Sequence, residues 1–105
     1  MKYMIEYTVR NAGLRYDQNL DNFEALLKVF GTWTPEDGLE VHAFVGNLSN
    51  GGYVLVEAAD PGVVASFVLK FTAWNDVEVV PVMDIAEVVG HGAEALAWDR
   101  AALSD

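Results

Sequence analysis

Two glutamates and a histidine are the residues of this sequence best suited to move a proton. Glu6, His42 and Glu57 each lie in a stretch whose composition predicts a strand. If these strands form one sheet with the first and third at its centre, Glu6 and Glu57 stand on neighbouring strands and face the same way. Two carboxylates close together in a partly dry site raise the pKa of at least one of them, and histidine titrates near neutral pH. We therefore name these three as candidate catalytic residues, acting as a general acid or base.

The same residues also have structural explanations. Glu6 and Glu57 can be solvated on an exposed sheet face or bonded across a dimer interface, and a single strand histidine is more often structural than catalytic. His91 lies between two glycines and is interpreted as a loop residue. The sequence has no cysteine and no His-x-His or His-x-x-x-His spacing, so we expect no metal site. We expect no cofactor either.

Four strands and two helices must position these residues. In chain order they are a strand over 2–10, a turn at 11–13, a helix over 17–30 ended by Gly31, strands over 40–46 and 53–58, a helix that starts at Asp60-Pro61, and a strand over 77–82. Each helix has one apolar face: Leu20, Phe23, Leu27 and Phe30 in the first, and Val64, Phe67, Val68 and Phe71 in the second.

This β-α-β-β-α-β order predicts an α+β fold of the ferredoxin-like kind, with two helices on one face of a four-stranded antiparallel sheet. Pro81 is tolerated only at a sheet edge or a strand end, so we expect the last strand to be an edge strand. Residues 1–84 form this domain. Residues 85–105 form a helical extension, interrupted at Gly90-His91-Gly92, that packs on the domain or on a partner subunit.

The helices leave one sheet face open, and strand alternation predicts its residues. It mixes apolar side chains with a few polar ones, as small-molecule sites do. The predicted face carries Met4, Glu6, Thr8, His42, Phe44, Tyr53, Leu55, Glu57, Glu78, Val80 and Val82. From it we name Phe44, Tyr53 and Glu78 as candidate ligand-binding residues. Trp33 and Trp74, at helix ends, are added because they could line the rim of a cavity.

Composition narrows the class of partner. The chain has 105 residues, 52% hydrophobic and 11% aromatic, which is a large apolar share for a monomer this small and favours a homodimer. Its net charge of −10 disfavours nucleic acid and anionic membranes. No apolar run approaches the length of a membrane span and no signal peptide pattern is present, so we expect a cytoplasmic protein.

Several segments resemble a bacterial family of small proteins of unknown function in the dimeric α/β-barrel superfamily. They are Glu57-Ala58-Ala59-Asp60-Pro61 at the second helix, Trp74-Asn75-Asp76 after it, and Val79-Val80-Pro81-Val82-Met83-Asp84 at the last strand. The resemblance covers about residues 2 to 84. It implies a dimer whose open sheet faces pair into a barrel that can hold a small molecule, and it implies no particular reaction.

We therefore expect a homodimer that binds or senses a small, mostly apolar molecule enclosed between its sheets. The alternative is an enzyme of the cofactor-independent monooxygenase or isomerase type, as found among similar barrels, in which Glu6, His42 or Glu57 moves a proton. A third interpretation is an interaction module whose tail after Asp84 docks on another protein.

Overall fold

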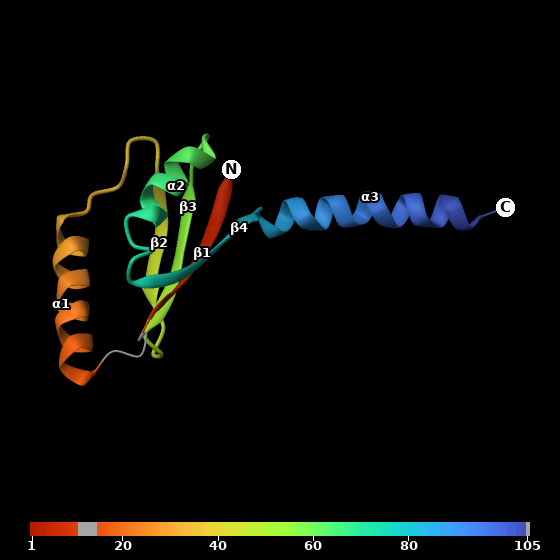
Figure 1. Ribbon diagram of the computed structural model, residues 1–105. Helices are drawn as coiled ribbons and strands as arrows, with labels where there is room; N and C mark the ends of the chain where they lie inside the picture. The colour runs from red at the N-terminus through yellow and green to blue at the C-terminus, as the bar shows by residue number, and fades with distance from the viewer. Residues whose placement is uncertain (11–14, 105) are drawn as a thin grey trace.

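The computed structural model describes residues 1–10 and 15–104, so the turn predicted at 11–13 lies outside the described residues. The elements are β1 (Lys2–Val9), α1 (Tyr16–Thr32), β2 (Glu40–Gly46), β3 (Gly51–Glu57), α2 (Pro61–Leu69), β4 (Asn75–Val82) and α3 (Ile85–Leu103) (Figure 1). The four strands form an antiparallel sheet in the order β2-β3-β1-β4. This confirms the predicted α+β fold, the central position of β1 and β3, and the edge position of the strand that contains Pro81.

α2 packs closely on the centre of the sheet. Asp60 caps the helix as predicted, since its Oδ1 accepts a hydrogen bond of 2.8 Å from the Gly62 N–H. The apolar face of α2 then buries Val64 and Phe67 against β1 and β3, whose Ile5, Val54 and Val56 are at most 2% exposed. Ile5, Val54 and Val56 alternate with the residues predicted for the open face, so their burial agrees with the predicted division of β1 and β3 into two faces.

α1 covers the same side of the sheet but packs loosely. Its one buried residue among those described is Leu26, which is 8% exposed. The apolar face predicted from Leu20, Phe23, Leu27 and Phe30 is only partly covered, because these four side chains are 42% to 55% exposed. Phe23, Leu27 and Phe30 nevertheless lie towards the sheet, since they line the space between α1 and the sheet together with Leu26. α1 also continues through Gly31, where the sequence predicted its end.

α3 is one continuous helix that projects from the end of β4 (Figure 1). The predicted interruption at Gly90-His91-Gly92 was wrong, since a glycine costs a helix only about 1 kcal/mol relative to alanine and this segment is rich in alanine. None of its described residues is buried. The radius of gyration is accordingly 19.1 Å, against about 13 Å for a compact domain of this length.

Lys2 and Asp84 join the start of β1 to the start of α3. The Lys2 Nζ lies 2.7 Å from the Asp84 Oδ1. This hydrogen bond raises the pKa of Lys2 above its ordinary value. Among the described residues, no helix is long and apolar enough to cross a bilayer.

Gly52, near the start of β3, allows β1, β2 and β3 to approach one another closely. The Tyr7 hydroxyl reaches across β3 and donates a hydrogen bond of 3.3 Å to the Val45 carbonyl oxygen. A Cβ atom on Gly52 would lie directly against that carbonyl oxygen and 2.6 Å from the Tyr7 Oη. Only glycine fits beneath this bridge.

We predict that Gly52→Ala lowers the free energy of unfolding by at least about 2 kcal/mol, because the new methyl group must displace backbone atoms. Gly31→Ala is the control, since a Cβ at Gly31 meets no atom within 4 Å; it should leave stability unchanged or raise it slightly. Urea unfolding measures both. Equal stability of Gly52→Ala and the wild type would contradict the described packing.

Candidate functional site

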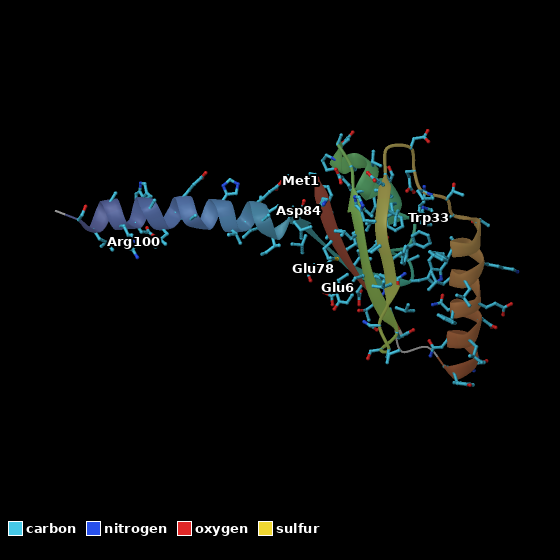
Figure 2. The ribbon with its side chains drawn as sticks, turned by 180° about the vertical axis from the view of Figure 1, so that it is seen from behind. Met1, Glu6, Trp33, Glu78, Asp84 and Arg100 are labelled. Atoms are coloured by element: carbon cyan, nitrogen blue, oxygen red, sulfur yellow. The ribbon has the colours of Figure 1, made fainter. Side chains whose placement is uncertain are left out.

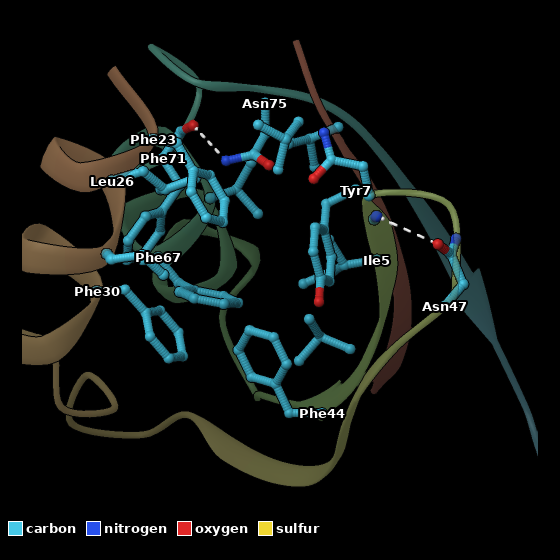
Figure 3. A pocket seen from close by; sticks show the side chains of 17 residues that line it. Ile5, Tyr7, Phe23, Leu26, Phe30, Phe44, Asn47, Phe67, Phe71 and Asn75 are labelled. Atoms are coloured by element: carbon cyan, nitrogen blue, oxygen red, sulfur yellow. Dashed lines mark hydrogen bonds between the residues drawn. The ribbon is translucent and has the colours of Figure 1, made fainter. Parts of the chain in front are cut away.

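A cavity of about 600 Å³ lies between α1 and the sheet, beside α2. β1 contributes Ile5, Tyr7 and Val9 to its wall, and α1 contributes Leu26 and Phe30. Figure 3 shows Ile5 and Tyr7 on one side of the space, with Leu26 and Phe30 on the other. The cavity follows from the loose packing of α1, which stands over the sheet without filling the volume beneath it.

One side of the cavity is an aromatic wall. Phe30, Phe44, Phe67 and Phe71 line it from α1, β2 and the α2 region. Trp33 lies behind them, stacked on Phe67 with ring centroids 4.7 Å apart. Edge-to-face contacts join Phe30 to Phe44 at 5.5 Å and Phe67 to Phe71 at 5.9 Å. Such arrangements stabilise aromatic pairs beyond simple burial and present a rigid apolar surface.

A few polar side chains interrupt this apolar lining, and none of the described residues that line it is charged. Burial raises the pKa of Tyr7, so its phenol remains protonated and donates to the Val45 carbonyl. The Asn47 Oδ1 accepts from the backbone N–H groups of Ser49 and Gly51. Asn75, at the start of β4, is 6% exposed and donates its amide N–H to the Phe71 carbonyl at 3.0 Å.

Glu36 fixes the loop that carries Trp33. Its carboxylate accepts a hydrogen bond of 3.1 Å from the Trp33 Nε1 and lies 2.5 Å from the Lys70 Nζ at the end of α2. Burial alone would raise the pKa of Glu36, but the hydrogen bonds from Lys70, its own backbone N–H and Trp33 outweigh it and lower the pKa below the ordinary value. The ionised carboxylate thus holds Trp33 against the aromatic wall.

The predicted catalytic residues lie on the opposite face of the sheet, in two separate groups. Glu6 stands opposite Tyr53 on β3 and Glu78 on β4, whereas Glu57 stands opposite Lys2. Glu6 and Glu57 are therefore four residue positions apart along neighbouring strands, or roughly 13 Å. The structure does not bring this pair of carboxylates together. Figure 2 shows Glu6 and Glu78 on the sheet, on the side away from Trp33.

His42 and Glu57 do meet on this open face. The His42 Nε2 lies 2.9 Å from the Glu57 Oε1, and both side chains are partly exposed. With Glu40 they place three ligand-type atoms within 4.8 Å of one another, a spacing at which they could hold a divalent cation. The sequence predicted no metal site because its histidines lack the spacing of metal ligands; Glu57 comes next to β2 only through strand pairing. The absence of a metal stays a prediction.

Phe44 was placed on the wrong face by the sequence. Strand alternation put it beside His42 on the open face, but the β2–β3 register shifts between Val41 and Ala43. This bulge inserts one residue and reverses the alternation beyond it. Phe44 is consequently opposite Val54 and lines the cavity.

The remaining predicted residues divide between the two faces. Tyr53, like Glu78, is on the open face and is 42% exposed. Trp33 and Trp74 are partly buried against the core on the helix side. Asn75, Tyr7 and Leu26 were not predicted as site residues: no sequence pattern marks a space that is left unfilled.

A family model described as Domain of unknown function (DUF3303) matches residues 1–96. The chain belongs to this family. The match covers the whole sheet, α1 and α2, and continues into α3, so the DUF3303 domain includes the first turns of the projecting helix. A search of curated proteins gives no match. Membership agrees with the predicted uncharacterised small-protein family and assigns no reaction.

We predict that Glu36→Gln lowers the free energy of unfolding by about 1 to 2 kcal/mol at pH 7, because the charged hydrogen bonds to Trp33 and Lys70 are weakened. Since the pKa of Glu36 is lowered on folding, its contribution is present above the ordinary value of 4.5 and is lost as the pH falls through the folded pKa. Unfolding followed by tryptophan fluorescence should show the difference shrinking in acid. Glu24→Gln, at an exposed position of α1, is the control. A difference that stays constant down to about pH 3 would contradict this account.

Proposed function

We propose that this chain binds a small, mostly apolar molecule in the cavity beneath α1. The observation that carries the proposal is the cavity itself: its volume of about 600 Å³ lies within the range of small-molecule sites, and its lining is apolar with a few polar groups. A bound molecule would cover the partly exposed Phe23, Leu27 and Phe30 of α1, which the protein alone leaves unburied. The sequence had placed such a ligand on the open face instead.

Binding or sensing fits this site better than catalysis. None of the described lining residues carries a carboxylate, imidazole or amine that could transfer a proton at neutral pH. The enzyme alternative depends on Glu6, His42 and Glu57, which lie on the far side of the sheet. Their catalytic role stays a prediction.

We predict that N-phenyl-1-naphthylamine, a neutral apolar fluorophore, binds saturably with one site per chain. Val77→Phe should weaken its binding at least tenfold, because Val77 lines the cavity from β4 and the larger ring occupies the ligand's space. Fluorescence titration measures both affinities.

Val80→Phe is the matched control for this experiment. It makes the same change on the same strand, at an open-face position that is 45% exposed. It should bind the fluorophore like the wild type. Non-saturable binding, or equal loss in both variants, would contradict a site beneath α1.

We further propose that two copies pair through the open sheet face, as the dimeric barrels that the sequence resembles do. Val45, Tyr53 and Val80 are 42% to 52% exposed on three strands of this face, with Met4 and Leu55 partly buried between them. An apolar strip of this kind on a small domain is typical of an interaction surface. α3 offers a second apolar surface, with Ile85, Val89 and Leu96 exposed on one side.

We predict a dimer at micromolar concentration and its dissociation by Leu55→Lys, since Leu55 is on a central strand of this face. Light scattering coupled to size-exclusion chromatography gives the mass. A chain ending at Asp84 separates the two surfaces: it should remain a folded dimer if the sheets form the interface. A wild-type monomer, or a dimer abolished only by removing α3, would refute pairing through the sheet.

A further inference from the structure

We propose that the molecule bound beneath α1 is neutral and carries a hydrogen-bond donor that pairs with the Asn75 Oδ1. This inference rests on the proposed function and adds the chemical class of the ligand. Its basis is the one buried side-chain acceptor among the described residues that has no hydrogen-bond partner.

The oxygen of the Asn75 side-chain amide has no hydrogen-bond partner, although it could accept two hydrogen bonds. The amide nitrogen donates to the Phe71 carbonyl at 3.0 Å, which determines which end of the amide is the oxygen. Figure 3 shows the nitrogen turned to Phe71 and the oxygen turned towards the space between Phe71 and Tyr7. The oxygen itself is covered by protein atoms, so a ligand donor reaches it once the covering side chains shift. The loose packing of α1 allows such a shift, since Leu26 is its one buried anchor among the described residues.

A purely structural role does not account for this asparagine. The Phe71 carbonyl already accepts from the backbone N–H groups of Trp74 and Asn75, both at 3.1 Å, so it would remain bonded without the side chain. Leaving an amide oxygen buried without a donor is unfavourable for the folded protein. An apolar residue of similar shape would avoid this cost, which indicates that the oxygen serves a bound molecule.

The other polar side chains of the wall compete less for the ligand's donor. Asn50 also lines the wall, but it is exposed and can bond to water. The Tyr7 hydroxyl is engaged with Val45, and the Asn47 oxygen already accepts from two backbone N–H groups. A charged ligand is disfavoured because none of the described lining residues can neutralise it. The fitting class is therefore an aromatic or aliphatic alcohol, phenol or neutral N–H compound with an apolar body.

The test compares 2-naphthol with 2-methoxynaphthalene, which has a similar shape but no donor. Isothermal titration calorimetry should show that the wild type binds 2-naphthol more tightly than 2-methoxynaphthalene. Asn75→Leu should weaken the binding of 2-naphthol about tenfold and leave the affinity for 2-methoxynaphthalene unchanged. Comparing the ratio of the two probe affinities between the variant and the wild type cancels the different hydration of the two probes. Asn22→Leu makes the same change at a partly buried position outside the cavity wall and should behave like the wild type.

Thermal unfolding supplies a readout that separates binding from structure. Asn75→Leu should unfold at a temperature no lower than the wild type, because it removes a buried acceptor without a partner. If Asn75→Leu does not fold, Asn75→Ala is measured in its place. If a folded Asn75 variant has the same ratio of affinities for the two probes as the wild type, the inference is overturned, while the cavity remains a binding site. Failure of both probes to bind the wild type would overturn the proposed function itself.

Discussion

The packing of α2 against β1 and β3 is the interaction on which the rest of this structure depends. Val54 and Val56 are at most 1% exposed and share one cluster with Val64 and Phe67, and burial of each such side chain contributes about 1.5 to 3 kcal/mol. Among the described residues, α1 contributes one buried side chain, Leu26, to this cluster. Because one helix holds the sheet, the other can stand away from it, and the space between becomes a cavity whose aromatic wall is held by Trp33 and Glu36. The proposed binding site and the loose packing of α1 therefore have the same origin in this chain.

Much of the fold could be predicted because its signals are local. Asp60 and Pro61 begin α2 through a cap that involves only neighbouring residues, and alternation in β1 correctly separates Ile5 from Glu6. The edge position of β4 follows from the missing N–H of Pro81. α3 shows the limit of such signals: two glycines suggested a break, but their cost is small beside the helical preference of the residues around them.

The site could not be predicted to the same extent, because it depends on register and on unfilled volume. A single bulge in β2 moves Phe44 to the cavity side, and no local sequence pattern indicates this bulge. The separation of Glu6 from Glu57 is set by how β1 pairs with β3, which alternation cannot determine. The loose packing of α1, with Leu26 as its one buried side chain among the described residues, follows from no pattern in the sequence, yet it decides where the cavity lies. The role proposed for Asn75 depends on the residues that surround it in the fold, and these cannot be inferred from its neighbours in the sequence.

The most direct test of this account is to record intermolecular nuclear Overhauser effects between N-phenyl-1-naphthylamine and the methyl groups of the ¹³C-labelled protein. The two faces of the sheet carry different methyl groups, so the experiment reports which face the probe occupies. The account predicts contacts to Leu26, Val54 and Val77, which line the cavity. Contacts to Leu55 and Val80 instead, on the open face, would contradict it.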